Sequence, residues 1–246
     1  MMPLKFLSYF VGLLLTGITF LMGSCGSPTG KAPAKTASQT QKITANDSTK
    51  SKANGSSQKK ILFFGNSLTA GFGLKLTEAF PHLIQLKIDS LGWGYQVMNG
   101  GLSGETTASG KTRIDWFLEE KIEVFVLELG GNDGLRGIAV EETKANLQAI
   151  IDKAKTKNPQ IKIVLAGMQV PPNMGQTYGQ AFSQMYPELA KANQAVLIPF
   201  LLEKVGGEPS LNLPDGIHPT VQGHQIVAQT VWKFLRPVLE ELNQAS

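Results

Sequence analysis

The chain has 246 residues, of which 42% are hydrophobic and 17% are charged. This composition can fill a core, which excludes a wholly disordered chain and argues against a coiled coil. A single cysteine excludes an internal disulfide framework and a cysteine-rich zinc site, and three histidines leave little for a histidine-rich metal centre. The net charge is +4, but residues 26–60 carry seven lysines and one aspartate, so the chain beyond them is mildly acidic. The overall basic charge therefore does not indicate nucleic-acid binding.

The first 25 residues have the pattern of a bacterial export signal. Lys5 precedes an almost wholly apolar run from Phe6 to Met22, which is short for a membrane span of about 20 residues. The sequence LMGSC at 21–25 resembles a lipobox, whose cysteine is lipidated and becomes the new N-terminus. We expect Cys25 to anchor an exported lipoprotein in a membrane, facing the periplasm or the cell exterior. The alternatives are an ordinary signal peptide cleaved elsewhere and an uncleaved anchor.

Residues 26–59 have the composition of a tether, rich in Ser, Thr, Lys, Ala, Gln and Gly. Ile43 is the only large apolar residue between residues 26 and 58. Because this small apolar surface cannot offset the loss of chain entropy on folding, we expect the segment to be disordered. A flexible coil of this length spans roughly 30 Å. It would separate the membrane anchor from a single folded domain at residues 60–246.

Within that domain, short apolar runs alternate with helical patterns. In chain order, the sequence predicts a strand at 61–64, a helix at about 76–91, a strand at 95–99, a helix at about 108–120, a strand at 124–129, a helix at about 141–156, a strand at 161–167, a helix at about 180–193, a strand at 195–198 and a last helix at about 219–242. This alternation predicts an α/β fold, in which helices cover both faces of a parallel sheet.

Polar, glycine-containing loops follow the predicted strands, at the sheet edge where such folds gather their working groups. A serine nucleophile needs a neighbouring base and donors for the oxyanion. Ser67 directly follows the first strand, and His218 is the candidate base. Asp215, three residues earlier, can bind the His218 Nδ1 and leave Nε2 facing the serine. The candidate oxyanion donors are the backbone N–H groups of Ser67 and Gly104 and the side-chain amide of Asn132.

Each of these residues alone has an ordinary explanation: Ser67 as a helix cap, Asn132 and Asp215 as turn residues, and His218 as a structural or surface residue. His82 and His224 lie in predicted helices, and we interpret both as structural. The hypothesis of a serine hydrolase depends on four such loops occurring together at one edge of the sheet.

Four blocks of the sequence resemble the SGNH (GDSL) hydrolases, most closely the bacterial arylesterase, thioesterase I and lysophospholipase branch. The blocks are FGNSLTAG at 64–71, GLSGET at 101–106, ELGGNDGLRG at 128–137 and DGIHP at 215–219. The resemblance covers residues 60–240. It implies a flavodoxin-like three-layer αβα sandwich with a five-stranded parallel sheet. It also implies hydrolysis of esters and thioesters without a metal or an organic cofactor.

One position departs from that family pattern. Most members have aspartate where this chain has Asn66, so the GDSL block reads Gly-Asn-Ser-Leu. Asparagine keeps the size and one oxygen acceptor but removes a negative charge beside the nucleophile. We expect activity to survive the change, with an altered rate or pH profile.

The loops after the third and fourth strands are expected to line the acyl site, through Asp133, Gly134, Leu135, Val170 and Pro171, with the stretch at 168–175 as one wall. The expected protein is a monomeric serine esterase that acts on aryl or short-to-medium acyl esters, on thioesters or on lysophospholipids. It would bind a small-molecule ester and a membrane, but no nucleic acid. The alternatives are a carbohydrate O-acetylesterase of the same fold and a non-catalytic binding protein. A flavin-binding module is disfavoured, because the loop after the first strand lacks a Ser/Thr-rich phosphate cradle.

Overall fold

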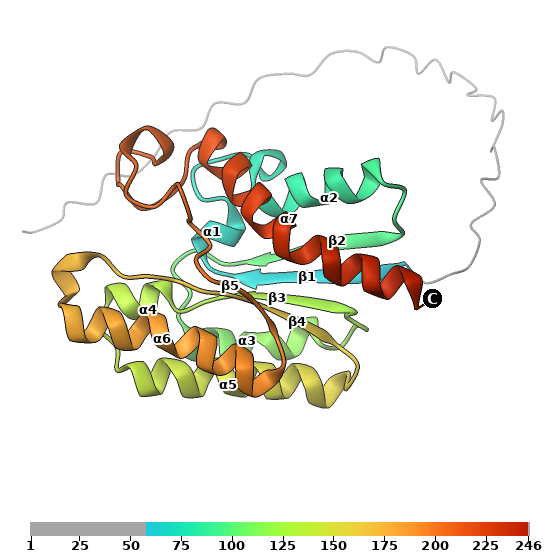
Figure 1. Ribbon diagram of the computed structural model, residues 1–246, viewed down its shortest axis with the longest axis horizontal. Helices are drawn as coiled ribbons and strands as arrows, with labels where there is room; N and C mark the ends of the chain where they lie inside the picture. The colour runs from blue at the N-terminus through green and yellow to red at the C-terminus, as the bar shows by residue number, and fades with distance from the viewer. Residues whose placement is uncertain (1–57, 246) are drawn as a thin grey trace, which may run out of the picture. The chain divides into compact units, whose positions relative to one another are not determined.

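Five parallel strands form the centre of the domain in the computed structural model, which describes residues 58–245 (Figure 1). The strands are β1 (Lys59–Gly65), β2 (Tyr95–Gly101), β3 (Val124–Glu128), β4 (Lys162–Ala166) and β5 (Val196–Ile198). They lie side by side in the order β2-β1-β3-β4-β5. The predicted export signal, Cys25 and almost all of the predicted tether lie outside the described residues.

Helices cover both faces of this sheet. They are α1 (Ser67–Ala70), α2 (Phe80–Ser90), α3 (Thr107–Phe117), α4 (Gly131–Leu135), α5 (Val140–Lys157), α6 (Gln176–Asn193) and α7 (Val221–Gln244). Three short 3₁₀ turns are η1 (Leu76–Glu78), η2 (Pro172–Met174) and η3 (Pro209–Leu211). In Figure 1, α2 and α7 lie on one face of the sheet, and α3, α5 and α6 lie on the other. The predicted three-layer α/β fold is therefore confirmed.

The core lies between the sheet and its helices. All of β3 is buried, as is β1 from Ile61 onward, so these two neighbouring interior strands are apolar without alternation. This pattern is expected of a parallel sheet that is covered on both faces. The exception is Glu128, a buried acid at the end of β3. No helix within residues 58–245 combines the length and the apolar character that a membrane crossing needs.

Two parts of the helical pattern differ from the prediction. The helix predicted at 76–91 is divided into η1 and α2, because Ala79 has an extended backbone and Pro81 lies in the first turn of α2. Proline is well tolerated in a first turn, where its missing N–H has no intrahelical partner. The short helices α1 and α4 were not predicted, because four or five residues are too few to show a helical period.

Both of these short helices lie at the carboxyl edge of the sheet. α1 begins two residues after β1 ends, and α4 begins three residues after β3 ends. The parallel register pairs Gly65 with Gly101 on β2 and with Glu128 on β3. The loops that follow β1, β2 and β3 therefore leave the sheet at the same level, as expected for a site at this edge.

Candidate active site

Ser67 is the first residue of α1, immediately after the turn that ends β1. Asn66 caps the helix, since its Oδ1 accepts a hydrogen bond from the Leu68 backbone N–H at 2.9 Å. Gly71 ends the helix in the left-handed conformation, with φ of 75°. The Ser67 side chain is thereby held at a tight turn between a strand and a helix. Its N–H, at the first helical position, has no partner within the helix.

His218 and Asp215 reach Ser67 from the loop before α7. The His218 Nε2 lies 2.8 Å from the Ser67 Oγ, and the His218 Nδ1 lies 2.7 Å from the Asp215 Oδ2. The structure therefore brings together the three residues that the sequence analysis singled out. With Nδ1–H donating to the carboxylate, Nε2 is left as the acceptor of the serine proton.

The loop that carries His218 is itself fixed by Asp215. The second carboxylate oxygen, Oδ1, accepts the backbone N–H of Ile217 at 2.9 Å and of His218 at 3.0 Å. Hydrogen bonds from the backbone and the side chain of His218, and then from Ile217, lower the pKa of Asp215 to about 2. The Phe72 ring lies against the imidazole, with the two centroids 4.4 Å apart. Asp215 is thus ionised at neutral pH and orients the histidine.

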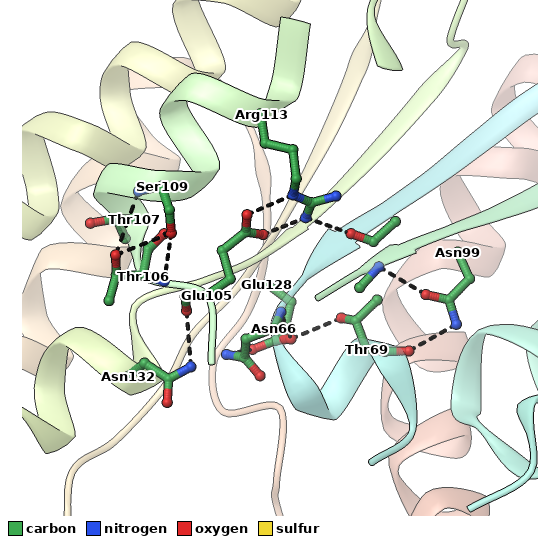
Figure 2. A network of polar contacts seen from close by, with 12 residues as sticks. Asn66, Thr69, Asn99, Glu105, Thr106, Thr107, Ser109, Arg113, Glu128 and Asn132 are labelled. Atoms are coloured by element: carbon green, nitrogen blue, oxygen red, sulfur yellow. Dashed lines mark hydrogen bonds and ion pairs between the residues drawn. The ribbon is translucent and has the colours of Figure 1, made fainter. Parts of the chain in front are cut away.

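Asn132, in α4, faces the same cavity as Ser67 and His218. Its Nδ2 donates to the Glu105 carbonyl oxygen at 2.9 Å, which ties α4 to the loop after β2 (Figure 2). An amide nitrogen carries two hydrogens, so one remains for an oxyanion. Gly104 adopts a φ of 80°, in the region that favours glycine, and no heavy atom lies within 4 Å of where a Cβ would be.

The loop after β2 is anchored by an ion pair between the buried Glu105 and the half-buried Arg113. The Arg113 Nε donates to the Glu105 Oε1 at 2.6 Å, and the Arg113 Nη2 contacts Oε2 of the same carboxylate. The guanidinium also donates to the Gly100 carbonyl at 2.7 Å and lies over the Phe64 ring. These contacts hold the segment that contains Gly104 against the sheet.

A cavity of about 540 Å³ opens beside Ser67 and His218. Leu135, Val170 and Pro171, three of the five residues predicted to contact substrate, line it, as do other members of the predicted wall at 168–175. Further apolar wall residues were not predicted: Phe200, Leu202 and Ile217. They come from the long connection between β5 and α7, which contains no periodic pattern from which their orientation could have been deduced.

The other two predicted substrate contacts do not reach this cavity. Asp133 is fully buried, and its carboxylate accepts from the Thr107 backbone N–H at 2.9 Å and from the Thr107 hydroxyl at 2.5 Å. Gly134 is packed so closely that a Cβ would lie 2.4 Å from a Val170 methyl and 2.9 Å from the Phe182 ring. The prediction for these two residues is corrected, because α4 turns them inward while its neighbouring residues Asn132 and Leu135 face the cavity.

The other two histidines lie in helices, as predicted. His224 is buried, its Nδ1 accepts from the Phe80 backbone N–H at 3.1 Å, and burial lowers its pKa to about 4. It is therefore a neutral structural residue, while His82 lies in α2. No group of three His, Cys, Asp or Glu side chains in the described domain is arranged to hold a metal ion.

The sequence model of the GDSL-like Lipase/Acylhydrolase family matches residues 63–226. Esterase TesA of Pseudomonas aeruginosa is 39% identical over 180 residues, which are 73% of this chain and 89% of that protein. Thioesterase 1/protease 1/lysophospholipase L1 of Escherichia coli K12 is 36% identical, over 73% of this chain and 84% of that protein. A crystal structure of TesA superimposes with a TM-score of 0.70 at 38% identity, covering 73% of this chain and 99% of that one.

Proposed function

The chain belongs to the GDSL-like lipase/acylhydrolase family and is a serine esterase, and we propose that Ser67, His218 and Asp215 are its catalytic triad. The observation that carries this assignment is the continuous chain of contacts from Asp215 through His218 to the Ser67 Oγ, at 2.7 and 2.8 Å. Both distances are within hydrogen-bond reach of a base and its nucleophile.

In the acylation step, the Ser67 Oγ attacks the carbonyl carbon of the ester while His218 Nε2 accepts the serine proton. The carbonyl oxygen becomes an oxyanion, which the Ser67 and Gly104 backbone N–H groups and the Asn132 amide would stabilise. Collapse of this intermediate breaks the bond to the leaving oxygen or sulfur. His218 then protonates that atom, so an alcohol or thiol departs and the acyl group remains on Ser67.

Deacylation repeats the same proton transfers with water as the nucleophile. His218 accepts a proton from water, whose oxygen attacks the acyl-enzyme, and then returns the proton to the Ser67 Oγ. Asp215 stays ionised throughout and stabilises the imidazolium that forms in each half of the cycle. The overall reaction consumes one ester and one water, and it yields a carboxylic acid and an alcohol or thiol.

We infer that the enzyme prefers aryl and short-to-medium acyl esters. The wall of the cavity is largely apolar, with Leu135, Met168, Val170, Phe200 and Leu202 among its residues. Its volume of about 540 Å³ suits a small acyl or aryl group. The relatives named as an arylesterase, from Vibrio mimicus, and as a thioesterase and lysophospholipase support esters and thioesters as the substrate classes.

The purified full chain should be assayed with p-nitrophenyl esters from acetyl to decanoyl, beside Ser67→Ala. Ser90→Ala is the matched control, because Ser90 is exposed at the far end of α2. We expect turnover on short-to-medium esters that Ser67→Ala abolishes and Ser90→Ala retains. A clear preference for acetylated sugars over aryl esters would indicate a carbohydrate O-acetylesterase instead. A folded protein without turnover on any ester would favour the binding-protein alternative.

We also propose that the protein is an exported lipoprotein anchored through Cys25. The support is the sequence alone: an apolar run followed by Leu-Met-Gly-Ser-Cys, with the only cysteine of the chain at the lipidated position. Cells that express the protein would be fed a clickable palmitate analogue and then fractionated. Label and membrane association should be present in the parent and lost in Cys25→Ser. Export without label would instead indicate an ordinary signal peptide.

A further inference from the structure

Glu128 is a buried acid that the proposed mechanism does not use. It ends β3, where the sheet register places it beside Gly65 of β1, and only 1% of its surface is exposed. Its Oε2 accepts the Asn66 backbone N–H at 3.1 Å and the Thr69 hydroxyl at 2.8 Å, and its Oε1 accepts the Asn66 Nδ2 at 2.8 Å (Figure 2). One carboxylate therefore binds the residues on both sides of the nucleophile turn, with Ser67 between them.

Both polar atoms of the Asn66 side chain have partners, and those of the oxygen and of the nitrogen are of opposite kind. Oδ1 accepts from the Leu68 backbone N–H at 2.9 Å and from the Ser67 Oγ at 3.5 Å, and Nδ2 donates to Glu128 at 2.8 Å. Only a side chain with one acceptor and one donor satisfies both kinds of contact. An aspartate at position 66 would keep the cap but would place a second carboxylate against Glu128, so the two acids would have to share a proton.

The space for this contact is made by Gly65. A Cβ at that position would lie 2.2 Å from the Thr69 hydroxyl and 2.4 Å from the Glu128 Oε2. The Thr69 carbonyl is tied in turn to β2, because it accepts from the Asn99 Nδ2 at 2.9 Å (Figure 2). The turn that carries Ser67 is thus fixed to both neighbouring strands, and Glu128 supplies the connection to β3.

The electrostatic surroundings of Glu128 consist of neutral donors and other acids. Burial raises its pKa to about 7, while hydrogen bonds from Thr69 and Asn66 act to lower it. From α6, Tyr186 donates its hydroxyl to the Leu129 carbonyl at 3.0 Å. Burial, and then the charges of Glu128 and of Asp133 in α4, raise the Tyr186 pKa. No Lys, Arg or His side chain of residues 58–245 forms an ion pair with Glu128. The Asn66 amide therefore supplies a contact that no cation replaces.

We propose that Glu128 is a positioning residue for Ser67, acting through Asn66 as a matched carboxylate–amide pair. The proposal rests on the proposed function in taking Ser67 as the nucleophile. It assigns a reason for asparagine in the Gly-Asn-Ser-Leu block: the amide lets Glu128 hold the turn while ionised. A change to either member alone then disturbs the nucleophile, whereas exchanging the acid and the amide between the two positions preserves the contact.

The test compares Asn66→Asp, Glu128→Gln and the double variant Asn66→Asp/Glu128→Gln in the full chain. In the double variant, the amide introduced at position 128 would donate to the carboxylate introduced at position 66, and its oxygen would still accept from Thr69. We expect each single variant to lose about 10- to 100-fold in kcat at pH 8, as for a nucleophile displaced by a fraction of an ångström, with little change in KM. The kcat of the double variant should recover to within about threefold of the parent, because the effects of substitutions at residues in contact are not additive.

The pH profile separates positioning from a general loss of structure. In Asn66→Asp, the two acids must share one proton to stay in contact. The kcat of this variant relative to the parent should therefore fall about tenfold per pH unit once the pH exceeds the higher apparent pKa of the pair. Asn193→Asp is the matched control. It also converts a buried asparagine to an acid, but at the far end of α6, where the amide donates to the Gln148 Oε1 at 2.7 Å. It should leave the kcat profile unchanged.

Two results would overturn the proposal: a double variant no faster than the slower single variant, or an Asn66→Asp activity ratio that is constant with pH. If a single variant proves too unstable to assay, the double variant still decides, since a folded double variant with low kcat contradicts the pairing. Failure of the proposed function looks different, because the parent itself would then be inactive or Ser67→Ala would retain turnover.

Discussion

Asp215 holds the loop before α7 and the His218 imidazole through different oxygens. Oδ1 accepts the backbone N–H groups of Ile217 and His218, and Oδ2 faces the His218 Nδ1. An asparagine could keep the first set of contacts through its oxygen, while its NH₂ group would face Nδ1. The imidazole would then be held in the tautomer that carries its proton on Nε2, where it cannot accept from serine.

Asp215→Asn should therefore keep the fold and lose catalysis. By analogy with the same change in trypsin-like triads, we expect kcat to fall about 10⁴-fold. The measurement is kcat on the preferred p-nitrophenyl ester, with thermal unfolding as the check on structure. Asp89→Asn, at an exposed position in α2, is the control. A loss of less than tenfold in a folded variant would contradict the assignment of Asp215.

Asn132 combines two tasks, since its amide fixes the loop after β2 and faces the cavity. Asn132→Ala should lower kcat about 10²- to 10³-fold, the usual cost of one oxyanion donor, with a smaller effect on KM. Asn158→Ala is the control, because Asn158 also donates to a backbone carbonyl, that of Ile122, but lies before β4 at the opposite edge. Equal kcat values for the two variants would remove Asn132 from the oxyanion site.

At the scale of elements, the strand-to-helix junction needs a glycine at position 65 because neighbouring atoms approach it closely, not because its backbone angle is unusual. A Cβ there would meet the Thr69 hydroxyl, the Glu128 carboxylate and the Glu128 carbonyl, all within 2.6 Å. Part of this contact is backbone, which cannot move aside without shifting β3. The junction of β1 and α1 and the end of β3 therefore form one packed unit.

Gly65→Ala should destabilise the fold by about 1–3 kcal/mol, because the added methyl overpacks this unit, and it should lower kcat as well. Gly94→Ala is the control, since no heavy atom lies within 4 Å of its Cβ position. Chemical denaturation and ester turnover are the measurements. If the two alanine variants proved equally stable, the close packing described for Gly65 would be wrong.

The elements that were well predicted are those with enough residues to show a period. β1 and β3 are apolar runs, and α5 and α7 show an apolar face, so the sheet and its long helices could be predicted. The short helices α1 and α4 could not. Missing them led to the misplacement of Asp133, whose direction depends on the turn of α4.

The grouping of Ser67, Asp215 and His218, which the structure brings together, was predictable because the chemistry of a serine nucleophile identifies such residues. The site was not predictable where the role depends on register. Asn66 and Glu128 are 62 residues apart, and their contact exists only because β1 and β3 pair with Gly65 beside Glu128. No local pattern in the sequence reports such a pairing, so the departure at Asn66 could be noticed but not explained.

At the scale of the whole molecule, two buried groups give opposite pH dependences of stability. The pKa of Glu128 is raised from 4.5 to about 7, so its contribution to folding stability falls as pH rises through that interval. The pKa of His224 is lowered from 6.5 to about 4, so the folded state gains stability as pH rises from 4 to 6.5. Each shift corresponds to about 3 kcal/mol.

The free energy of unfolding of the parent should therefore change little between pH 4.5 and 6.5, since the two contributions oppose each other. Glu128→Gln should leave only the His224 contribution, so its free energy of unfolding should rise by about 2 kcal/mol across that window. Conversely, stability should fall with pH in His224→Asn, whose side-chain oxygen can still accept from Phe80. Urea denaturation at steps of half a pH unit measures the free energy of unfolding of the parent and of both variants. Parallel curves for all three proteins would contradict the assignment of these charges.

The most direct test of the catalytic assignment is to identify the residue that becomes acylated. The full chain would be treated with a p-nitrophenyl phosphonate ester, which traps a serine nucleophile covalently, and the modified peptide would be mapped by mass spectrometry. We predict one phosphonyl group on Ser67, release of one equivalent of p-nitrophenol and loss of esterase activity in proportion to labelling. Labelling of another residue, or esterase turnover that survives in Ser67→Ala, would contradict the assignment.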